Sequence, residues 1–548
     1  MNATVVAAPA RNDRNIIFLV GLDAEDTPAA HLRKSYDVLT HLQTVIKDTT
    51  TRPAYLLAAI ASGFELPDHG LAGPALLASQ TGLLKVAAAE WPGTVVRSID
   101  LARKGKSAEE LAQVLFDEIT HGEGDLEVRI KSSKERLVAS LTVDRGPEMV
   151  GAVAGPIVAI GGARGVTAAC LLAMVDGSKP AVALLGRTPL TDEPAWARRV
   201  ADGELRAKAI AAPEHKGQTP KQVESHVKSV LALREVRATV DALKAKGCEV
   251  LVLSADARDK ASLAAAIKTV TERFGAPKTY LHGAGVLADQ LIEKKDADSW
   301  NRVVGTKIDP ILNLASLAKK GSAFLLFGSI AGRAGNPGQS DYAAANAALA
   351  RMGEALARGA GMAVRTVDWG PWDGGMVTAG LRRMFEERGI PVIPERDGAR
   401  QGAIEMGAAS AGQATEVVFG PAPDRLTMPC AKSLAIAVSA RELPYLEDHR
   451  IQGDAVIPLV LVQEWFLRAL RATHPSRRVA ALDDVQVLKG IVLSEATSTP
   501  FFIEWGPQAD GQTRIFLVDG EGHRRFSAKV SNLLPTAVGA PELRGAAL

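Results

Sequence analysis

Three polar side chains between residues 329 and 346 are of the types that can move a proton. Ser329 follows an apolar strand pattern at 324–327, and a Gly-rich loop separates it from Tyr342 and Asn346, which stand four residues apart in an Ala-rich helical pattern. Because side chains four residues apart share one face of a helix, the spacing predicts a hydroxyl, a phenol and an amide around one small volume. Such a group can deliver a proton to a carbonyl oxygen. On its own, the same stretch also fits a plain loop between a buried strand and a helix.

The composition excludes several classes of partner and site. The chain of 548 residues has 64 basic and 62 acidic side chains with no long run of one sign, which argues against nucleic acid and membrane surfaces as partners. Neither a targeting segment nor an apolar run of about twenty residues is present, so we expect a cytoplasmic protein. Cys170, Cys248 and Cys430 share no motif spacing, so neither disulfides nor a metal site are predicted. The length predicts roughly three or four domains.

Strand and helix patterns alternate from residue 15 to residue 150, after an expected tail at 1–14. Apolar strand patterns stand at 16–20, 55–60 and 94–99, and a helical pattern follows each. This alternation predicts a doubly wound parallel sheet. The first strand runs into Gly-Leu-Asp-Ala-Glu-Asp, which places acidic side chains where a phosphate would need backbone amides. We therefore expect a Rossmann-like shell that holds no nucleotide.

A second series of strands begins after residue 150 with a glycine-rich turn. The apolar strand at 157–160 leads directly into Gly-Gly-Ala-Arg-Gly-Val-Thr and then into a helical pattern. Glycine suits this place because a tight turn lets amides at a helix N-terminus approach a pyrophosphate. The expected cofactor-binding residues of the turn are Gly161, Gly162, Arg164, Gly165 and Val166.

Three further strands end in residues that could face a dinucleotide. The patterns at 181–185, 249–254 and 279–281 predict parallel neighbours of the first strand. Arg187 follows the first of them, where its guanidinium could pair with the 2′-phosphate of NADPH. The other expected cofactor-binding residues at these strand ends are Asp256, Ala257, Gly283, Ala284 and Gly285.

Two segments of this half interrupt the alternation. Residues 192–244 are long and charged, with a helical pattern at 223–244, and we interpret them as a surface insertion, with partner docking as the alternative. Residues 378–400, which are rich in Arg, are a candidate lid over a substrate, and prolines at 421, 423 and 429 indicate a linker.

The last part of the chain changes character from about residue 441. One strongly apolar helical pattern at 459–470 is followed by segments rich in β-forming residues at 485–488, 491–494, 501–505, 513–518 and 525–530. The order predicts an α+β unit in which an antiparallel sheet wraps one helix.

Residues 157–376 resemble the ketoreductase domain of modular polyketide synthases and, more closely, of bacterial polyunsaturated fatty acid synthases, a branch of the short-chain dehydrogenase/reductases. Most reductases of that superfamily place Lys four residues after Tyr, where this chain has Asn346, and the polyketide type supplies an upstream lysine, here Lys307. The resemblance identifies residues 15–150 as the truncated structural subdomain and 151–430 as the catalytic NADPH-binding subdomain. The turn departs from the family pattern at Ile160 and Thr167, which puts close backbone approach there in doubt.

The resemblance implies a reaction and a role for each residue. The expected reaction is NADPH-dependent reduction of a 3-ketoacyl thioester on an acyl carrier protein. Tyr342 would be the acid, Ser329 a hydrogen-bond donor to the same oxygen, Lys307 a nearby cation, and Asn346 the holder of a relay water. Leu287-Ala288-Asp289 stands where D-type ketoreductases carry Leu-Asp-Asp, which favours a D-hydroxy product.

Residues 431–548 resemble a single hot-dog dehydratase domain. His449, Gly453 and Pro458 fit the His-x3-Gly-x4-Pro pattern of polyketide dehydratases, in which the His takes the α-proton of the 3-hydroxyacyl thioester. Glu464 occupies the place of the helix carboxylate of stand-alone hot-dog dehydratases, which pair His and acid across a dimer interface. The resemblance thus implies a homodimer and a second, dehydrating step. Two alternatives stay open: a ketoreductase whose hot-dog domain only dimerises or docks, and a small-molecule alcohol dehydrogenase of the short-chain superfamily.

Overall fold

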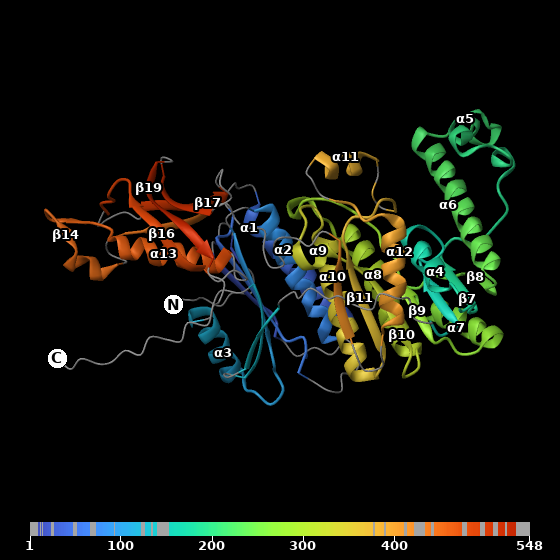
Figure 1. The fold of residues 1–548 in the computed structure, drawn as a ribbon, viewed down its shortest axis with the longest axis horizontal. Coiled ribbons are helices and arrows are strands. Elements are labelled where there is room, and N and C mark those ends of the chain that lie inside the picture. The colour runs from blue at the N-terminus through green and yellow to red at the C-terminus, as the bar shows by residue number, and fades with distance from the viewer. Residues whose placement is uncertain are drawn as a thin grey trace.

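The described residues form three large sheets, each with its own helices, and one small two-stranded sheet (Figure 1). The computed structural model describes residues 9–10, 13, 15–22, 27–47, 52–65, 73–91, 94–121, 126–132, 135–139, 153–375, 377, 379–387, 391–409, 414–420, 433–439, 443–473, 479–493, 499–507, 513–520 and 523–532. Most of the expected tail and all of the expected proline linker lie outside these residues. No helix in the described ranges is long and apolar enough to cross a membrane.

The first sheet has five strands in sequence order, four of them parallel. Its strands are β1 (Asn15–Gly21), β2 (Tyr55–Ile60), β3 (Val95–Leu101), β4 (Glu127–Ser132) and the antiparallel β5 (Glu135–Val138). Its helices are α1 (Pro28–Ile46), α2 (Ala78–Glu90) after a short 3-10 turn η1 (Pro74–Leu77), and α3 (Ala108–His121). Leu56 and Ala58 face α1 and α2, whereas Leu57 and Ala59 face α3, so both faces are covered as predicted.

The second sheet has seven parallel strands in the order β12-β11-β10-β9-β6-β7-β8. They are β6 (Ile157–Ile160), β7 (Val182–Gly186), β8 (Val250–Ser254), β9 (Thr279–His282), β10 (Ala323–Ser329), β11 (Ala363–Trp369) and β12 (Ala414–Phe419). One face packs on α7 (Lys260–Phe274), α8 (Ala297–Leu317) and α10 (Ser340–Ala360). The other packs on α4 (Gly165–Met174), α6 (Pro220–Ala245) and α12 (Glu395–Gly407). The predicted α/β class with parallel, Rossmann-like sheets is confirmed.

The two parallel sheets are joined by close packing of α2 against α10. A Cβ on Gly82 of α2 would lie 2.4 Å from the backbone oxygen of Ala343 on α10, so only glycine allows this approach. Apolar side chains of both sheets form one continuous core. The first sheet therefore fixes the position of α10, the helix that carries Tyr342 and Asn346.

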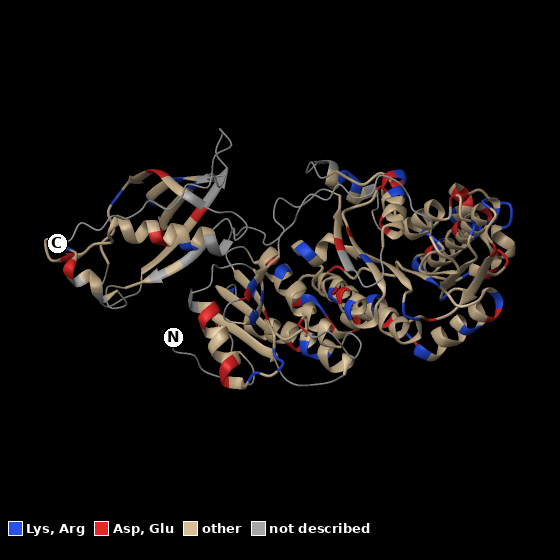
Figure 2. Ribbon diagram, turned by 60° about the horizontal axis from the view of Figure 1, so that its bottom comes forward, with Lys and Arg blue, Asp and Glu red and all other residues tan. Residues whose placement is uncertain are grey.

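The insertion forms a helical projection at one end of the molecule (Figure 1). Its long helix α6 begins at a capping box made by Thr219 and Gln222 and packs on α5 (Leu205–Ala211) around a small apolar core of its own. Acidic and basic residues are intermixed over this half of the molecule (Figure 2).

The prediction of a lid at 378–400 is wrong for its second half. The segment contains α11 (Ala379–Glu387), but residues 395–400 form the first part of α12, which packs on α4. A Cβ on Gly402 would lie 2.7 Å from Cys170 Sγ, and one on Gly398 would lie 2.5 Å from the Trp372 ring. This helix is part of the core and cannot open like a lid.

The last sheet is antiparallel, in the order β13-β17-β18-β19-β16, and lies at the end of the molecule away from α5 and α6 (Figure 1). Its strands are β13 (Ser433–Val438), β16 (Val479–Val487), β17 (Thr499–Pro507), β18 (Thr513–Asp519) and β19 (Arg524–Asn532). The helix α13 (Leu459–Thr473) buries Val462, Phe466 and Leu470 against the sheet, as the α+β prediction required. The strand predicted at 491–494 is wrong, because in the described part of that segment only Val492 forms a bridge, to Val456.

Candidate active site at the carboxyl edge of the seven-stranded sheet

Ser329 is the last residue of β10, so its side chain lies at the carboxyl edge of the sheet. The strand pairs in parallel with β11, which sets Ser329 opposite Trp369. Ser329 is also the N-cap of the short helix α9 (Ile330–Ala334), and its Oγ accepts a hydrogen bond of 3.2 Å from the Ala331 N–H. Strand and cap together hold the hydroxyl in one place.

Tyr342 and Asn346 lie one turn apart on α10, as the spacing predicts. The Tyr342 hydroxyl lies beside the Ser329 side chain, and burial raises the pKa of Tyr342 although the side chains of Ser329 and Asn346 oppose the shift. The phenol is therefore protonated at neutral pH. Asn346 is buried, its Nδ2 donates to the Tyr342 carbonyl at 2.8 Å, and its Oδ1 has no partner in the described chain. An unpaired buried oxygen beside a phenol is a place for a bound water.

Lys307 lies on α8 with its ammonium buried beneath the same edge. The Nζ atom donates to the Phe327 carbonyl of β10 at 2.9 Å and makes no hydrogen bond to Tyr342 in the described structure. Burial lowers the pKa of Lys307 to about 8, although the carboxyl group of Asp368 opposes the shift. The ammonium thus lies close to β10 and titrates near the working range of an acid–base group.

The glycine-rich turn is built for close approach between neighbouring strand ends. Gly161 has φ +73°, and a Cβ there would lie 2.8 Å from the Ala284 nitrogen, so the turns after β6 and β9 touch. Thr167, which departs from the family pattern, is buried with its Oγ1 only 1.9 Å from where a Cβ of Gly283 would be. The missing side chain at Gly283 thus makes room for the larger side chain at Thr167. The two turns can therefore approach closely although Thr167 replaces the glycine of the family pattern.

The remaining predicted cofactor residues lie along the same edge. Arg187 is exposed after β7, and Asp256 follows β8 in an ion pair of 2.7 Å with Arg258, which with Arg187 holds the pKa of Asp256 low. The turn after β11 returns to the glycine turn, since a Cβ on Gly375 would lie 3.1 Å from Val166 Cγ1. Gly165 has φ +58° and is the first residue of α4, and the exposed Arg164 is the N-cap of that helix. Ala257, which follows β8, is buried. Backbone amides, left-handed glycines and an exposed guanidinium fit a dinucleotide with its phosphates at α4.

One carboxylate at this turn could not have been found from the sequence. Glu235 of the insertion helix α6 accepts a hydrogen bond of 2.8 Å from the Gly165 N–H. Because the Gly165 N–H already donates to a carboxylate, it is oriented to donate to an anionic group at this turn.

The comparisons with known proteins agree with this geometry. A family model described as the KR domain matches residues 155–374, and one described as the polyketide synthase dehydratase domain matches residues 429–518. Residues 155–374 are a ketoreductase domain of the polyketide and polyunsaturated fatty acid synthase type.

Two relatives of this chain are much larger proteins. A polyunsaturated fatty acid synthase polypeptide of Thraustochytrium sp. is 33% identical over 435 residues, which are 75% of this chain and 15% of that protein. The mycoketide-CoA synthase of Mycobacterium tuberculosis is 33% identical over 163 residues, 28% of this chain and 4% of that protein. The chain thus spans a small share of the length of the curated relatives it matches.

Solved structures share the fold of both parallel sheets. A ketoreductase domain from the bacillaene assembly line superposes with a TM-score of 0.53 at 19% identity, covering 72% of this chain and 84% of that one. A C2-type ketoreductase from a modular polyketide synthase does so with a TM-score of 0.56 at 19% identity, covering 74% of this chain and 79% of that one.

A buried ion pair anchors the ketoreductase segment that follows β9. Lys295 Nζ lies 3.0 Å from Asp341 Oδ1 with both side chains fully buried, and it also donates to the Ala288 carbonyl at 2.6 Å. Gln339 Nε2 donates to Asp289 Oδ2 at 3.2 Å. Residues 288–289 are thus tied to the turn directly before Tyr342, which the sequence did not reveal.

The dehydratase domain carries its two predicted residues on different elements. His449 is exposed at the end of the 3-10 helix η7 (Pro444–Asp448), before a hairpin of β14 (Arg450–Ile451) and β15 (Asp454–Ala455) whose turn needs Gly453 at φ +91°. Glu464 lies on α13 and pairs with Arg468 at 2.6 Å. Within the described chain, Glu464 pairs with Arg468 and makes no ion pair with His449.

Proposed function

We propose that the chain reduces a 3-ketoacyl thioester to the 3-hydroxyacyl thioester, with NADPH as the hydride donor. The observation that carries the proposal is the meeting of the Ser329 hydroxyl, the Tyr342 phenol and the Asn346 amide at the sheet edge that also bears the glycine turn. Ketoreductase relatives of the synthase type support the class of substrate.

Each side chain has a role in moving the proton. Bound NADPH supplies the hydride. Tyr342, protonated at neutral pH, gives its proton to the carbonyl oxygen, and Ser329 donates a hydrogen bond to the same atom. Lys307 provides a buried positive charge that favours the phenolate left behind, and Asn346 Oδ1 holds a water molecule that relays protons.

The dinucleotide would lie across the glycine turn with its 2′-phosphate at Arg187. Gly161, Gly162, Arg164, Gly165 and Val166 would hold the pyrophosphate at the start of α4. Arg187 is the exposed cation that favours NADPH over NADH, and Asp256, Ala257, Gly283, Ala284 and Gly285 would line the adenosine and nicotinamide ends.

The substrate would arrive on an acyl carrier protein, as part of polyketide or polyunsaturated fatty acid synthesis. We expect a D-hydroxy product because Asp289 keeps the last position of the Leu-Asp-Asp pattern of D-type ketoreductases, and Gln339 donates a hydrogen bond to it at the start of the helix that carries Tyr342. We propose functional units at 15–150, 151–430 and 431–548.

We further propose that the last unit is a hot-dog fold that dehydrates the product as a dimer. Glu464 shares the exposed face of α13 with Val460, which is 73% exposed, and Tyr445, Ile451 and Val492 are also more than half exposed. A second copy covering these apolar side chains would bring its own Glu464 toward His449. The Glu464–Arg468 pair favours the alternative, a module that only dimerises.

The reduction is tested with NADPH and a 3-ketoacyl thioester, following nicotinamide oxidation and product mass. Tyr342→Phe should lower kcat at least about 100-fold because the proton donor is lost. Tyr280→Phe is the matched control, since Tyr280 is a buried tyrosine stacked on Phe324 at 4.9 Å, away from the edge. Equal rates in Tyr342→Phe and the wild type would disprove the site.

A further inference from the structure

Asp368 is a buried carboxyl group without a hydrogen-bond donor, next to the proposed proton donor. It lies one residue before the end of β11, is 1% exposed, and neither of its oxygens has a partner in the described chain. A Cβ on Gly328 would lie 2.1 Å from Asp368 Oδ1, so the carboxyl group rests on β10 directly before Ser329. A buried acid with no donor must be accounted for.

The polar neighbour of Asp368 is a second carboxyl group. Glu416 of β12 contacts Asp368, and its Oε1 lies 3.2 Å from Arg333 Nε. Two carboxylates in contact cannot both be ionised, so the pair shares one proton. Burial and Glu416 raise the pKa of Asp368. Burial also acts to raise the pKa of Glu416, but Arg333, Arg351 and the Asp368 side chain together outweigh it and lower that pKa. The proton therefore resides on Asp368.

Lys307 lies beside the inner end of this pair. Its Nζ donates to the Phe327 carbonyl, which belongs to the peptide bond before Gly328, the residue on which Asp368 rests. When ionised, the Asp368 carboxylate raises the pKa of Lys307, so the two groups are neighbours. A proton on Asp368 is thus held next to the lysine of the active site.

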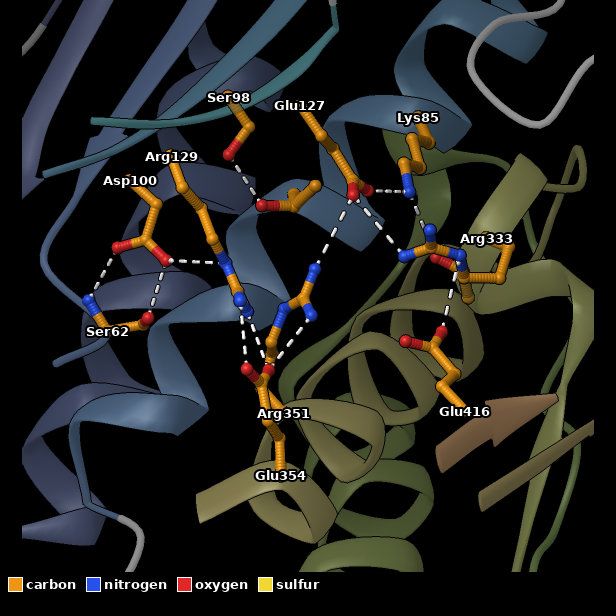
Figure 3. Close-up of polar contacts among 12 residues, drawn as sticks. Ser62, Lys85, Ser98, Asp100, Glu127, Arg129, Arg333, Arg351, Glu354 and Glu416 are labelled. Atoms are coloured by element: carbon orange, nitrogen blue, oxygen red, sulfur yellow. Dashed lines mark hydrogen bonds and ion pairs between the residues drawn. The ribbon is translucent and has the colours of Figure 1, made fainter. Parts of the chain in front are cut away.

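The outer end of the pair meets a cavity of about 180 Å³ between the two parallel sheets. Glu416 lines it with its side chain 23% exposed, together with Glu127, Arg333 and Arg351 (Figure 3). This volume has room for several water molecules, and the charged lining offers them partners.

We propose that Asp368 and Glu416 form a proton-delivery pair that reprotonates Lys307 from this cavity after each reduction. The inference rests on the proposed reduction. Tyr342 gives its proton to the carbonyl oxygen and is reprotonated at the expense of the Lys307 ammonium. The Asp368 carboxylic acid then protonates the Lys307 amine, and water in the cavity returns a proton to Asp368 through Glu416. One proton from solvent is consumed for each ketone reduced. Asp368 acts through Lys307 and is a positioning residue.

The test is rapid-mixing kinetics of Asp368→Asn, which keeps shape and removes the proton. The first turnover of NADPH oxidation should stay within about twofold of the wild type because Tyr342 starts protonated, and later turnovers should slow about tenfold or more with a larger solvent deuterium effect. Glu416→Gln should slow later turnovers in the same way. Glu405→Gln, a buried acid on the opposite helix α12, should change neither phase.

Two results would overturn the proposal: later turnovers as fast as in the wild type, or an equal loss in the first and later turnovers, which would indicate a structural role. A second measurement does not depend on activity. Infrared spectra of the wild type should contain the carbonyl band of a buried protonated carboxyl group, which Asp368→Asn removes and Glu405→Gln keeps. A wild type that shows this band but reduces no thioester would contradict the proposed reduction and leave the shared proton intact. A wild type without the band would contradict the proton-sharing pair of Asp368 and Glu416.

Discussion

His282 supports the candidate active site without taking part in the proposed reaction. It ends β9, is fully buried, and its Nε2, assigned as the protonated nitrogen, donates to the Lys307 carbonyl at 2.7 Å. Burial and the Lys307 charge lower the pKa of His282 to about 3. The ring is therefore neutral at neutral pH, and its Nε2–H helps to hold the backbone of the lysine helix in place.

This neutral ring makes stability depend on pH. The unfolded chain binds a proton at His282 near pH 6.5 and the folded chain only near pH 3, so the unfolding free energy is retained above 6.5 and falls as the pH is lowered between these values. The loss attributable to His282 is about 2 kcal/mol between pH 7 and about pH 5. Urea unfolding of His282→Gln should show a correspondingly shallower fall, whereas the exposed His226→Gln should match the wild type. An unchanged slope in His282→Gln would refute the assignment.

The sequence predicted the local part of the site and missed its long-range part. Ser329, Tyr342 and Asn346 were placed correctly because one strand, one loop and one helix join them. Asp368, Glu416 and the Lys295–Asp341 pair were missed because their contacts join segments that only the fold brings together. A single sequence carries no signal for such pairs.

Among the elements, α10 depends on glycine in the helix that supports it. Gly82→Ala would force a methyl group to within 2.4 Å of the Ala343 backbone oxygen, next to Tyr342. We expect a loss of about 1–3 kcal/mol in unfolding free energy together with slower reduction, because α10 must move. Thermal unfolding and the reductase assay check both effects. Gly203→Ala is the control, since no atom lies within 4 Å of its added methyl group, and equal behaviour of the two variants would refute the packing argument.

Most apolar strands were predicted from the sequence, although β12 and β13 were missed. The predictions at 55–60 and 157–160 match β2 and β6 residue for residue. The last two strands of the first sheet, β4 and β5, were missed because they alternate apolar residues with charges whose partners lie on other elements, as Arg129 pairs with Glu354 at 2.7 Å.

At the scale of the whole molecule, the proposed dehydration would use residues of two chains. If His449 of one chain works with Glu464 of another, His449→Ala and Glu464→Gln should each abolish dehydration of the 3-hydroxyacyl thioester, while a mixture of the two variants, unfolded and refolded together, regains part of it. Mass spectrometry of the enoyl product measures the result, and each variant refolded alone is the control. Mixtures as inactive as the single variants would exclude a site shared between chains. Dehydration unaffected by either variant would leave this unit as a module for assembly.

The exchange of volume between Thr167 and Gly283 has an evolutionary consequence. Because the Thr167 hydroxyl occupies the place of a side chain at Gly283, neither position can vary freely while the other is unchanged. Alanine at 283 is tolerable only with glycine at 167, so the two positions are epistatic although they belong to different strand–turn units. In comparisons between ketoreductases of this type, the two should therefore be treated as one inherited character, and a departure from the glycine pattern at 167 does not by itself indicate a lost cofactor site.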